Sequence, residues 1–200
     1  MRSESYWLDT APAFTGAQAG ELPARVDVAV VGGGFTGLSA ARALALKGAS
    51  VAVLEAGRVV GEASGRNGGH CNTGVAQDYA SLVASLGAER ARAYYRAYES
   101  AVQSVVSLVE EEGIACDLRR SGKLKLAAKP QHYDGLARTC ELIRREVDAE
   151  VELFSAEQVR AEVDSAAFHG GLLQRNGVQM HVGRFGVGLA EVAARHGALI

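Results

Sequence analysis

Three glycines with the spacing G-x-G-x-x-G, at Gly32, Gly34 and Gly37, are the residues of this chain that most directly suggest chemistry. In such a turn the first glycine allows a tight bend, the second lets the backbone approach a diphosphate, and the third permits close packing of helix on strand. The free N–H groups of Phe35 and Thr36 would face the diphosphate, where the helix dipole favours negative charge. The pattern predicts an anion site built from backbone. The alternative is an ordinary strand-to-helix turn.

An acidic residue stands where a dinucleotide fold needs one. Glu55 follows the apolar run Val51–Leu54 and lies 21 positions after Gly34. An acid about 20 residues beyond the turn reaches the hydroxyls of an adenosine ribose. A carboxylate there favours an unphosphorylated ribose, as in FAD or NAD, over that of NADP. The alternative is a solvated carboxylate at a strand end.

A long loop at residues 57–74, GRVVGEASGRNGGHCNTG, distinguishes a predicted FAD site from a predicted NAD site. A simple NAD domain would proceed to its next helix, whereas long loops inside compact domains are usually functional. Arg66 and Asn67 could hydrogen-bond the polar edge of a flat aromatic ring or the phosphates. The small residues that would let the backbone lie against such a ring are Ser64, Gly65, Gly68 and Gly69. The loop therefore favours FAD, with a flexible surface loop as the alternative.

The elements that must position these residues form a strand–helix–strand unit. Hydrophobic patterning predicts a strand at 26–31, a helix at 38–47 and a strand at 51–54. Beyond Gly74 it predicts helices at 79–86, 88–112 and 131–147, and strands within 117–128 and at 168–174. A helix interrupted by Gly186 and Gly188 is expected at 183–196, capped by Gly197, and residues 198–200 begin a strand that is cut off.

Several side chains of the later elements carry specific expectations. The charged residues of 117–128 are expected to face solvent, and the acidic run 110–112 to be a solvated helix end rather than a metal site. One helical face is predicted to be core; its members are Tyr94, Tyr98, Val102, Val105, Val106 and Val109.

Composition bounds the class of protein. The formal net charge is −2 at pH 7 and 48% of the residues are hydrophobic, so no basic excess points to nucleic acid. No run of 18 apolar residues and no signal peptide is present, which predicts a cytoplasmic protein without membrane partners. The three cysteines lack C-x-x-C spacing, and the sequence therefore predicts neither a disulfide framework nor a metal site.

Four stretches resemble a known family: GGGFTGLSAA at 32–41, LEAGR at 54–58, ASGRNGG at 63–69 and SYWLDTAP at 5–12. The chain resembles the N-terminal part of the D-amino-acid oxidase (DAO) group of FAD-dependent oxidoreductases, and most of all its gamma-glutamylputrescine oxidase branch. Some relatives attach flavin through a histidine in this loop; Arg66 stands in that place, so the resemblance implies noncovalent FAD. One departure is Glu62, where the family carries glycine. Its carboxylate would repel the diphosphate unless turned to solvent.

The resemblance also implies a set of cofactor-binding residues along the diphosphate, the ribose and the flavin ring: Gly32, Gly33, Gly34, Phe35, Thr36, Gly37, Glu55, Ala56, Arg58, Ser64, Arg66, Asn67, Gly68 and Gly69. It implies oxidation of the C–N bond of a small-molecule amine or amino acid, with the flavin accepting a hydride equivalent. The five histidines are scattered, and no catalytic acid or base is assigned.

The predicted fold is α/β: a Rossmann-like, doubly wound FAD-binding sheet with part of an α+β substrate domain, truncated so that a C-terminal half is missing. The expected divisions are an extension at 1–25, the first part of the FAD-binding domain at 26–76, a helical segment at 77–112, the start of the substrate domain at 113–178, and a return to the FAD-binding domain at 179–200. An NAD-dependent dehydrogenase, a noncatalytic dinucleotide-binding fragment and one half of a two-chain flavoprotein remain alternatives.

Overall fold

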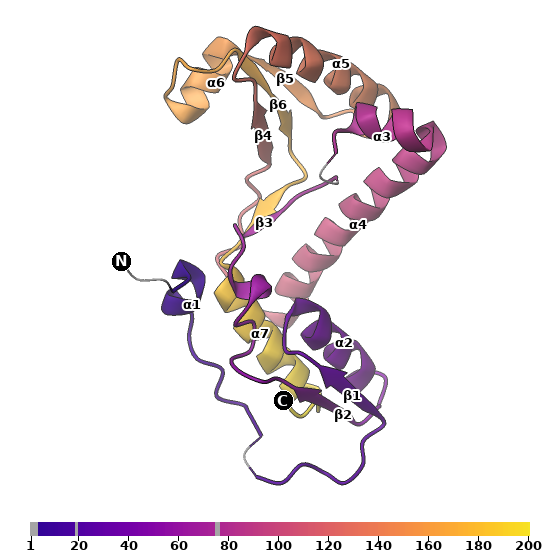
Figure 1. Ribbon diagram of the computed structural model, residues 1–200, viewed down its shortest axis with the longest axis vertical. Coiled ribbons are helices and arrows are strands. Elements are labelled where there is room, and N and C mark those ends of the chain that lie inside the picture. Colours follow the sequence, from indigo (N-terminus) through magenta and orange to yellow (C-terminus); the bar gives the residue numbers. More distant parts are fainter. Residues whose placement is uncertain (1–3, 19, 75–76) are drawn as a thin grey trace. The chain divides into compact units, whose positions relative to one another are not determined.

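The computed structural model describes residues 4–18, 20–74 and 77–200. It contains two compact units, each assembled from separate stretches of the chain. Unit 1 comprises the described residues up to Gly69 together with Ser107–Leu118 and Met180–Ile200, and unit 2 comprises His70–Val106 and Arg119–Gln179. Figure 1 labels most of their helices and strands.

Unit 1 is built on a parallel strand pair joined by a helix. The elements are β1 (Val28–Val31), α2 (Phe35–Ala45) and β2 (Val51–Leu54), and β1 and β2 pair in parallel with Val28 opposite Val51. On the other side of β2, Leu199 forms a parallel bridge with Ala52, and the Leu199 N–H donates to the Val51 carbonyl at 2.9 Å. The predicted strand–helix–strand unit is confirmed, and the last residues lie beside β2.

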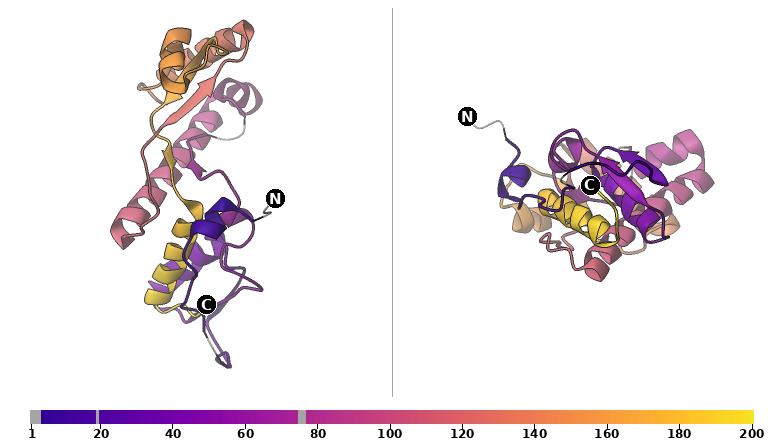
Figure 2. Two further views of the ribbon diagram at one scale, coloured as in Figure 1. Left: turned by 90° about the vertical axis from the view of Figure 1, so that its left-hand side faces the viewer. Right: turned by 90° about the horizontal axis from the view of Figure 1, so that it is seen from below.

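Helix α7 (Val182–Arg195) lies beside α2 in unit 1, as Figures 1 and 2 both show. The expected interruption at Gly186 and Gly188 is wrong, because the helix runs through both residues. A Cβ at Gly186 would stand 2.5 Å from the Val60 side chain, and one at Gly188 would stand 2.5 Å from that of Ile114. The two glycines therefore let neighbouring segments approach the helix, which offsets their low helix propensity.

One core cluster of unit 1 is made of small and β-branched residues. Its buried members come from α2, β2, α7 and the last residues: Ala41, Ala45, Val51, Val53, Ala193 and Ala198. Small residues bring helix and sheet close together, and the short distance positions the start of α2 against the ends of the strands. Helix α1 (Tyr6–Thr10) and the 3₁₀ turn η1 (Ala63–Gly65) complete the unit.

Unit 2 centres on an antiparallel sheet of order β4-β6-β5. The strands are β4 (Lys123–Leu126), β5 (Glu152–Ser155) and β6 (Gly170–Gln174). The helices are α3 (Tyr79–Leu86), α5 (Pro130–Glu146) and α6 (Ala156–Val163), and β3 (His70–Cys71) pairs with β7 (Val178–Gln179). Lys123 is only partly exposed, so the expectation that every charge of this segment faces solvent is wrong for that residue.

Helix α4 (Ala88–Glu112) has the bounds that the sequence predicts. Its predicted core face is wrong at two positions, because Tyr94 is 49% exposed and Tyr98 40% exposed. The apolar face passes instead through Tyr95, which is 3% exposed, and continues to the buried Val102 and Val106. Spacings of seven and four residues keep these three side chains on one face of the helix, whereas Tyr94 and Tyr98 project beside it. Within the described residues, none of the helices is both long and apolar enough to cross a membrane.

Candidate functional site

The glycine turn joins β1 to α2 in the geometry that its sequence predicts. Gly32 has φ +98°, a left-handed conformation that side-chain-bearing residues rarely adopt, and its N–H donates to the Leu54 carbonyl at 2.9 Å. A Cβ on Gly37 would overlap the Gly32 carbonyl oxygen, so only glycine permits this approach of helix to turn. Gly34 is the N-cap of α2 and offers no side chain to its first turn.

The start of α2 presents backbone donors. The N–H groups of Thr36 and Gly37 lie in the first helical turn, where no intrahelical acceptor exists for them. The Phe35 N–H, which was expected to face a diphosphate, instead donates to the Ser64 hydroxyl at 3.1 Å. Since a hydroxyl that accepts one hydrogen bond can still donate its own hydrogen, Ser64 extends the donor set of the helix start by one side chain.

Glu55 lies at the tip of β2 and is held by backbone on both sides. One carboxylate oxygen accepts from the Gly33 N–H at 2.7 Å and the other from the Gly57 N–H at 2.9 Å. These two bonds lower the pKa of Glu55, the Gly33 bond foremost, so the carboxylate is ionised at neutral pH. Each oxygen keeps a further acceptor position, which a ribose hydroxyl can use.

The loop around η1 is shaped by its own polar side chains. The Asn67 amide donates to the Ser64 carbonyl at 2.9 Å and its oxygen accepts from the Gly69 N–H at 2.9 Å. The Arg66 guanidinium donates to the Gly61 carbonyl at 2.9 Å and lies 3.7 Å from the carboxylate of Glu62. The Glu62 side chain is 93% exposed, so this departure from the family pattern does turn to solvent. The first role of these polar groups is to fix the loop.

A pocket of about 970 Å³ brings part of the predicted site together. Among the predicted residues, Glu55, Ala56 and Arg58 line it, next to apolar side chains such as Val31 and Leu54. The described residues of the glycine turn and of Ser64–Gly69 lie outside this lining. The pocket therefore contains the predicted residues at the tip of β2, and the predicted residues at the start of α2 do not line it.

Arg58 connects the site to the N-terminal segment. Its guanidinium donates to the Leu8 carbonyl at 2.8 Å and lies 4.0 Å from the Glu4 carboxylate. The residues Leu8, Asp9 and Phe14 line the same pocket. Segment 4–18 thus forms one wall of the pocket at the tip of β2, a role that the sequence analysis did not assign to the N-terminal extension.

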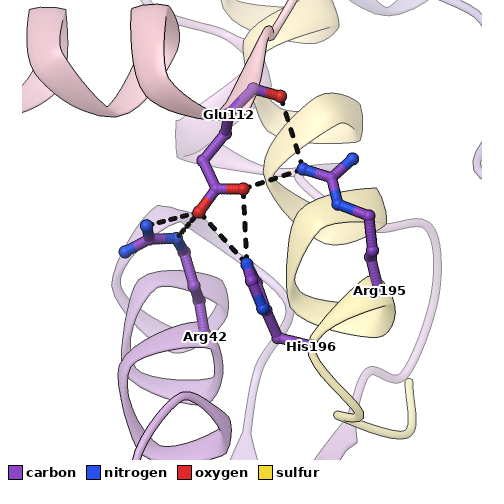
Figure 3. Close-up of polar contacts among 4 residues, drawn as sticks. All are labelled: Arg42, Glu112, Arg195 and His196. Carbon is purple, nitrogen blue, oxygen red and sulfur yellow. Dashed lines mark hydrogen bonds and ion pairs between the residues drawn. The ribbon is translucent and has the colours of Figure 1, made fainter.

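A half-enclosed charge cluster lies at the opposite end of α2 (Figure 3). The Glu112 carboxylate accepts from Arg42 Nε on α2 at 2.8 Å, from Arg195 on α7 at 2.8 Å and from the imidazole of His196 at 3.2 Å. Arg42 foremost, with Arg195 and His196, lowers the pKa of Glu112 to about 2. The Glu112 side chain is 11% exposed, so the prediction that this residue belongs to a solvated helix end is wrong. The hydrogen bonds from Arg42, Arg195 and His196 hold its carboxylate among the helices.

Other chemical groups are not gathered into a site. Among the described residues, no group of three His, Cys, Asp or Glu side chains could hold a metal ion, and Cys71, Cys116 and Cys140 are free. The His181 imidazole is buried at the start of α7, where it accepts from the Arg184 N–H at 3.2 Å and lies 2.9 Å from the Thr10 hydroxyl. This histidine has a capping role.

Comparison with known proteins places the chain among flavoproteins. Residues 27–200 match the family model DAO, described as FAD dependent oxidoreductase. The chain is 33% identical over 174 residues to the Gamma-glutamylputrescine oxidoreductase of Escherichia coli (strain K12), covering 87% of this chain and 41% of that protein. The family match confirms the predicted FAD; its noncovalent attachment stays a prediction.

Solved structures support the fold. The glycine oxidase of Geobacillus kaustophilus superposes with a TM-score of 0.71 at 24% identity, covering 87% of this chain and 45% of that one. An L-amino acid deaminase from Proteus vulgaris gives a TM-score of 0.74 at 18% identity, covering 94% of this chain and 47% of the other. The predicted α/β fold class is confirmed, and the chain spans less than half the length of each of these three proteins.

Proposed function

Because this chain belongs to the DAO family of FAD-dependent oxidoreductases, we propose that unit 1 binds FAD noncovalently and that the protein oxidises the C–N bond of an amine or amino acid. The name of the Escherichia coli relative, Gamma-glutamylputrescine oxidoreductase, favours a gamma-glutamylated amine as the substrate. A cytoplasmic location stays a prediction.

One observation carries the proposal: the glycine turn and the acid at the tip of β2 are joined by a direct hydrogen bond. The Gly33 N–H donates to the Glu55 carboxylate, and this contact between the acid and the turn supports a role for Glu55 as the ribose acceptor. A Cβ on Gly34 would stand 3.0 Å from the Ser64 hydroxyl, so a side chain there would fill the space above the turn. The residues present therefore fit a dinucleotide.

Each residue of this arrangement has a defined task. The N–H groups of Thr36 and Gly37 and the hydroxyl of Ser64 donate to the diphosphate, where the dipole of α2 also favours negative charge. Glu55 accepts from the ribose hydroxyls, and its ionised state makes those hydrogen bonds charge-assisted. When bound, FAD supplies the ring that accepts a hydride equivalent from the substrate carbon.

The proposal is tested on the purified 200-residue chain. We expect visible flavin absorbance after reconstitution with FAD, saturating at one FAD per chain, and no comparable retention of NAD. Addition of a gamma-glutamylated amine without oxygen should bleach the flavin, and readmitted oxygen should restore the colour. Retention of NAD in place of FAD would overturn the cofactor assignment.

A second candidate is one half of a two-chain flavoprotein, or a noncatalytic dinucleotide-binding protein. The observation that favours it is the outer edge of β1, which pairs with no other strand among the described residues. Val31, at the end of that strand, is 86% exposed although it is apolar. Stoichiometric FAD binding without bleaching by any amine would support this second candidate.

A further inference from the structure

Unit 2 contains a pocket of its own, between the sheet and helices α3, α4 and α5. Its volume is about 240 Å³. The strand register places Lys123 of β4 opposite Gln174 of β6, and Lys125 opposite Leu172. Since alternate residues of a strand share a face, these four side chains line one wall of the pocket. A pocket of this volume has room for a free amino acid or a small organic acid.

The other walls carry aromatic and aliphatic side chains together with a few polar ones, among them Thr73, Gln77, Asp78 and Thr139. The tyrosines come from α3 and α4, and the aliphatic residues from α3 and α5: Tyr79, Tyr94, Tyr95, Tyr98, Leu82, Leu136 and Ile143. Pockets of this kind bind a carbon skeleton on the apolar walls and orient it through a few polar groups.

One of those polar groups lacks a partner. Thr73 lines the pocket, is 3% exposed, and its hydroxyl has no hydrogen-bond partner among the described residues. Buried polar groups in the same pocket are paired: the Gln174 amide donates to the Tyr95 hydroxyl at 2.9 Å, and that hydroxyl lies 3.3 Å from the Asp148 carboxylate. Buried hydroxyls are nearly always hydrogen-bonded, so the Thr73 hydroxyl points to an acceptor supplied from outside.

The second polar group is a cation without a counterion. The Lys123 ammonium forms no ion pair with any described carboxylate, and burial together with the nearby Lys125 lowers the pKa of Lys123. Lys125, in contrast, lies near the Asp78 carboxylate. The Ser81 N–H is the main cause of the lowered pKa of Asp78, and the charge of Lys125 contributes to it. The Asp78 carboxylate also lines the pocket, but it accepts hydrogen bonds from the Ser81 N–H and hydroxyl and forms no ion pair with Lys123 among the described residues. An anion in the pocket would compensate the charge of Lys123.

We propose that this pocket binds the carboxylate of a small organic acid of amino-acid size. The Lys123 ammonium and the Thr73 hydroxyl hold the carboxylate, and Tyr95 and Leu172 contact the carbon skeleton. A carboxylate fits better than a phosphate, because phosphate sites use several cations or a nest of backbone N–H groups, whereas Lys125 interacts with Asp78 and Lys123 is left as the unpaired cation of the described lining. This site lies wholly within unit 2 and goes beyond the FAD site proposed for unit 1.

The test is calorimetric titration of the 200-residue chain with 3-phenylpropanoate and with its neutral amide. We expect saturable binding of the acid at least tenfold tighter than that of the amide. Lys123→Met keeps the stem of the side chain and should remove this preference, whereas Lys123→Arg should retain it. Lys129→Met is the matched control, because Lys129 is an exposed residue of the same unit outside the pocket lining, and it should leave both affinities unchanged.

Thr73→Val tests the hydroxyl independently. It should weaken the acid about fivefold, and Thr73→Ser should restore the parent affinity; this pair carries the test if Lys123→Met does not fold. Three results would overturn the proposal: no saturable binding of the acid, equal affinity for acid and amide, or an equal loss in Lys129→Met. The titration does not depend on flavin, so a failure of FAD binding would leave this result unaffected.

Discussion

The Glu55 carboxylate accepts a hydrogen bond from the Gly33 N–H at 2.7 Å, which ties the tip of β2 to the glycine turn between β1 and α2. A Cβ on Gly33 would stand 3.2 Å from the Glu55 side chain, so a glycine between the first two motif glycines keeps this contact close. The acid and the turn form one structural unit. A substitution in either should weaken the contacts proposed for both the ribose and the diphosphate.

Glu55→Gln should raise the dissociation constant of FAD about tenfold, because a charge-assisted hydrogen bond to ribose becomes a neutral one and Gln can accept through only one of its two end atoms. Equilibrium titration by flavin fluorescence measures the change. Glu21→Gln, an exposed carboxylate of the same unit, is the control. An unchanged dissociation constant would remove Glu55 from the site.

Gly34→Val should abolish FAD retention, and Gly34→Ala should weaken it strongly. The Gly34 φ of −83° suits any residue, so the effect comes from the added Cβ and its 3.0 Å contact with the Ser64 hydroxyl, where the diphosphate must approach. Gly135→Ala is the control, because a Cβ there, in α5, would meet only the Arg138 side chain, at 4.0 Å. The ratio of flavin to protein after purification reports the result, and a parent-like ratio in Gly34→Val would refute this assignment of the turn.

The local part of the site could be predicted from the sequence, because its signals lie within about thirty residues. The glycine spacing, the flanking strands and the acid at the tip of β2 depend on hydrophobic period and turn chemistry alone. The bond from Phe35 to Ser64 was missed, although a small hydroxyl residue after the turn is compatible with it. No local pattern shows that the Ser64 hydroxyl accepts its hydrogen bond from the Phe35 N–H.

The contacts of Glu112 could not be predicted from local sequence patterns. Its partners Arg42 and Arg195 lie 70 and 83 positions away in the chain, so helical spacing could only assign Glu112 to the solvent. Strand β5 and helix α6 were also missed, although a signal exists: Ser155 and Gln158 form a capping box, a pattern that marks the start of a helix. The two-residue strands β3 and β7 are too short for any period to be read.

Glu112→Gln should lower the free energy of unfolding at pH 7 by about 2 kcal/mol, because Arg42 and Arg195 lose their common counterion in a half-enclosed place. The folded-state pKa of about 2 lies below the ordinary value of 4.5, so this stability is present above about pH 4.5 and is lost as the pH falls toward 2. Denaturant unfolding of parent and variant across that range should converge at the acid end. Glu111→Gln, at an exposed neighbour, should follow the parent at every pH; a constant difference between parent and Glu112→Gln would contradict the assignment.

The open edge of β1 leads to the last prediction. Val31 is 86% exposed and Leu54, opposite it on β2, is 41% exposed, and both line the pocket of unit 1. Exposed apolar residues on an unpaired strand edge favour association and the binding of hydrophobic dyes. The 200-residue chain should therefore bind such a dye and self-associate as its concentration rises. Val31→Lys should reduce both effects, because a charge on a strand edge opposes pairing.

Dye fluorescence and sedimentation measure this prediction. The control is Val163→Lys, at a residue of unit 2 that is 40% exposed at the end of α6 and belongs to no strand edge. It should leave association and dye binding as they are in the parent. The prediction is contradicted if the parent chain stays monomeric at every concentration, binds no dye and retains tight FAD. Unit 1 would then be stable with the edge of β1 unpaired. The second candidate function would then lose the observation that favours it. The proposed amine oxidation would be assayed on this chain without a partner.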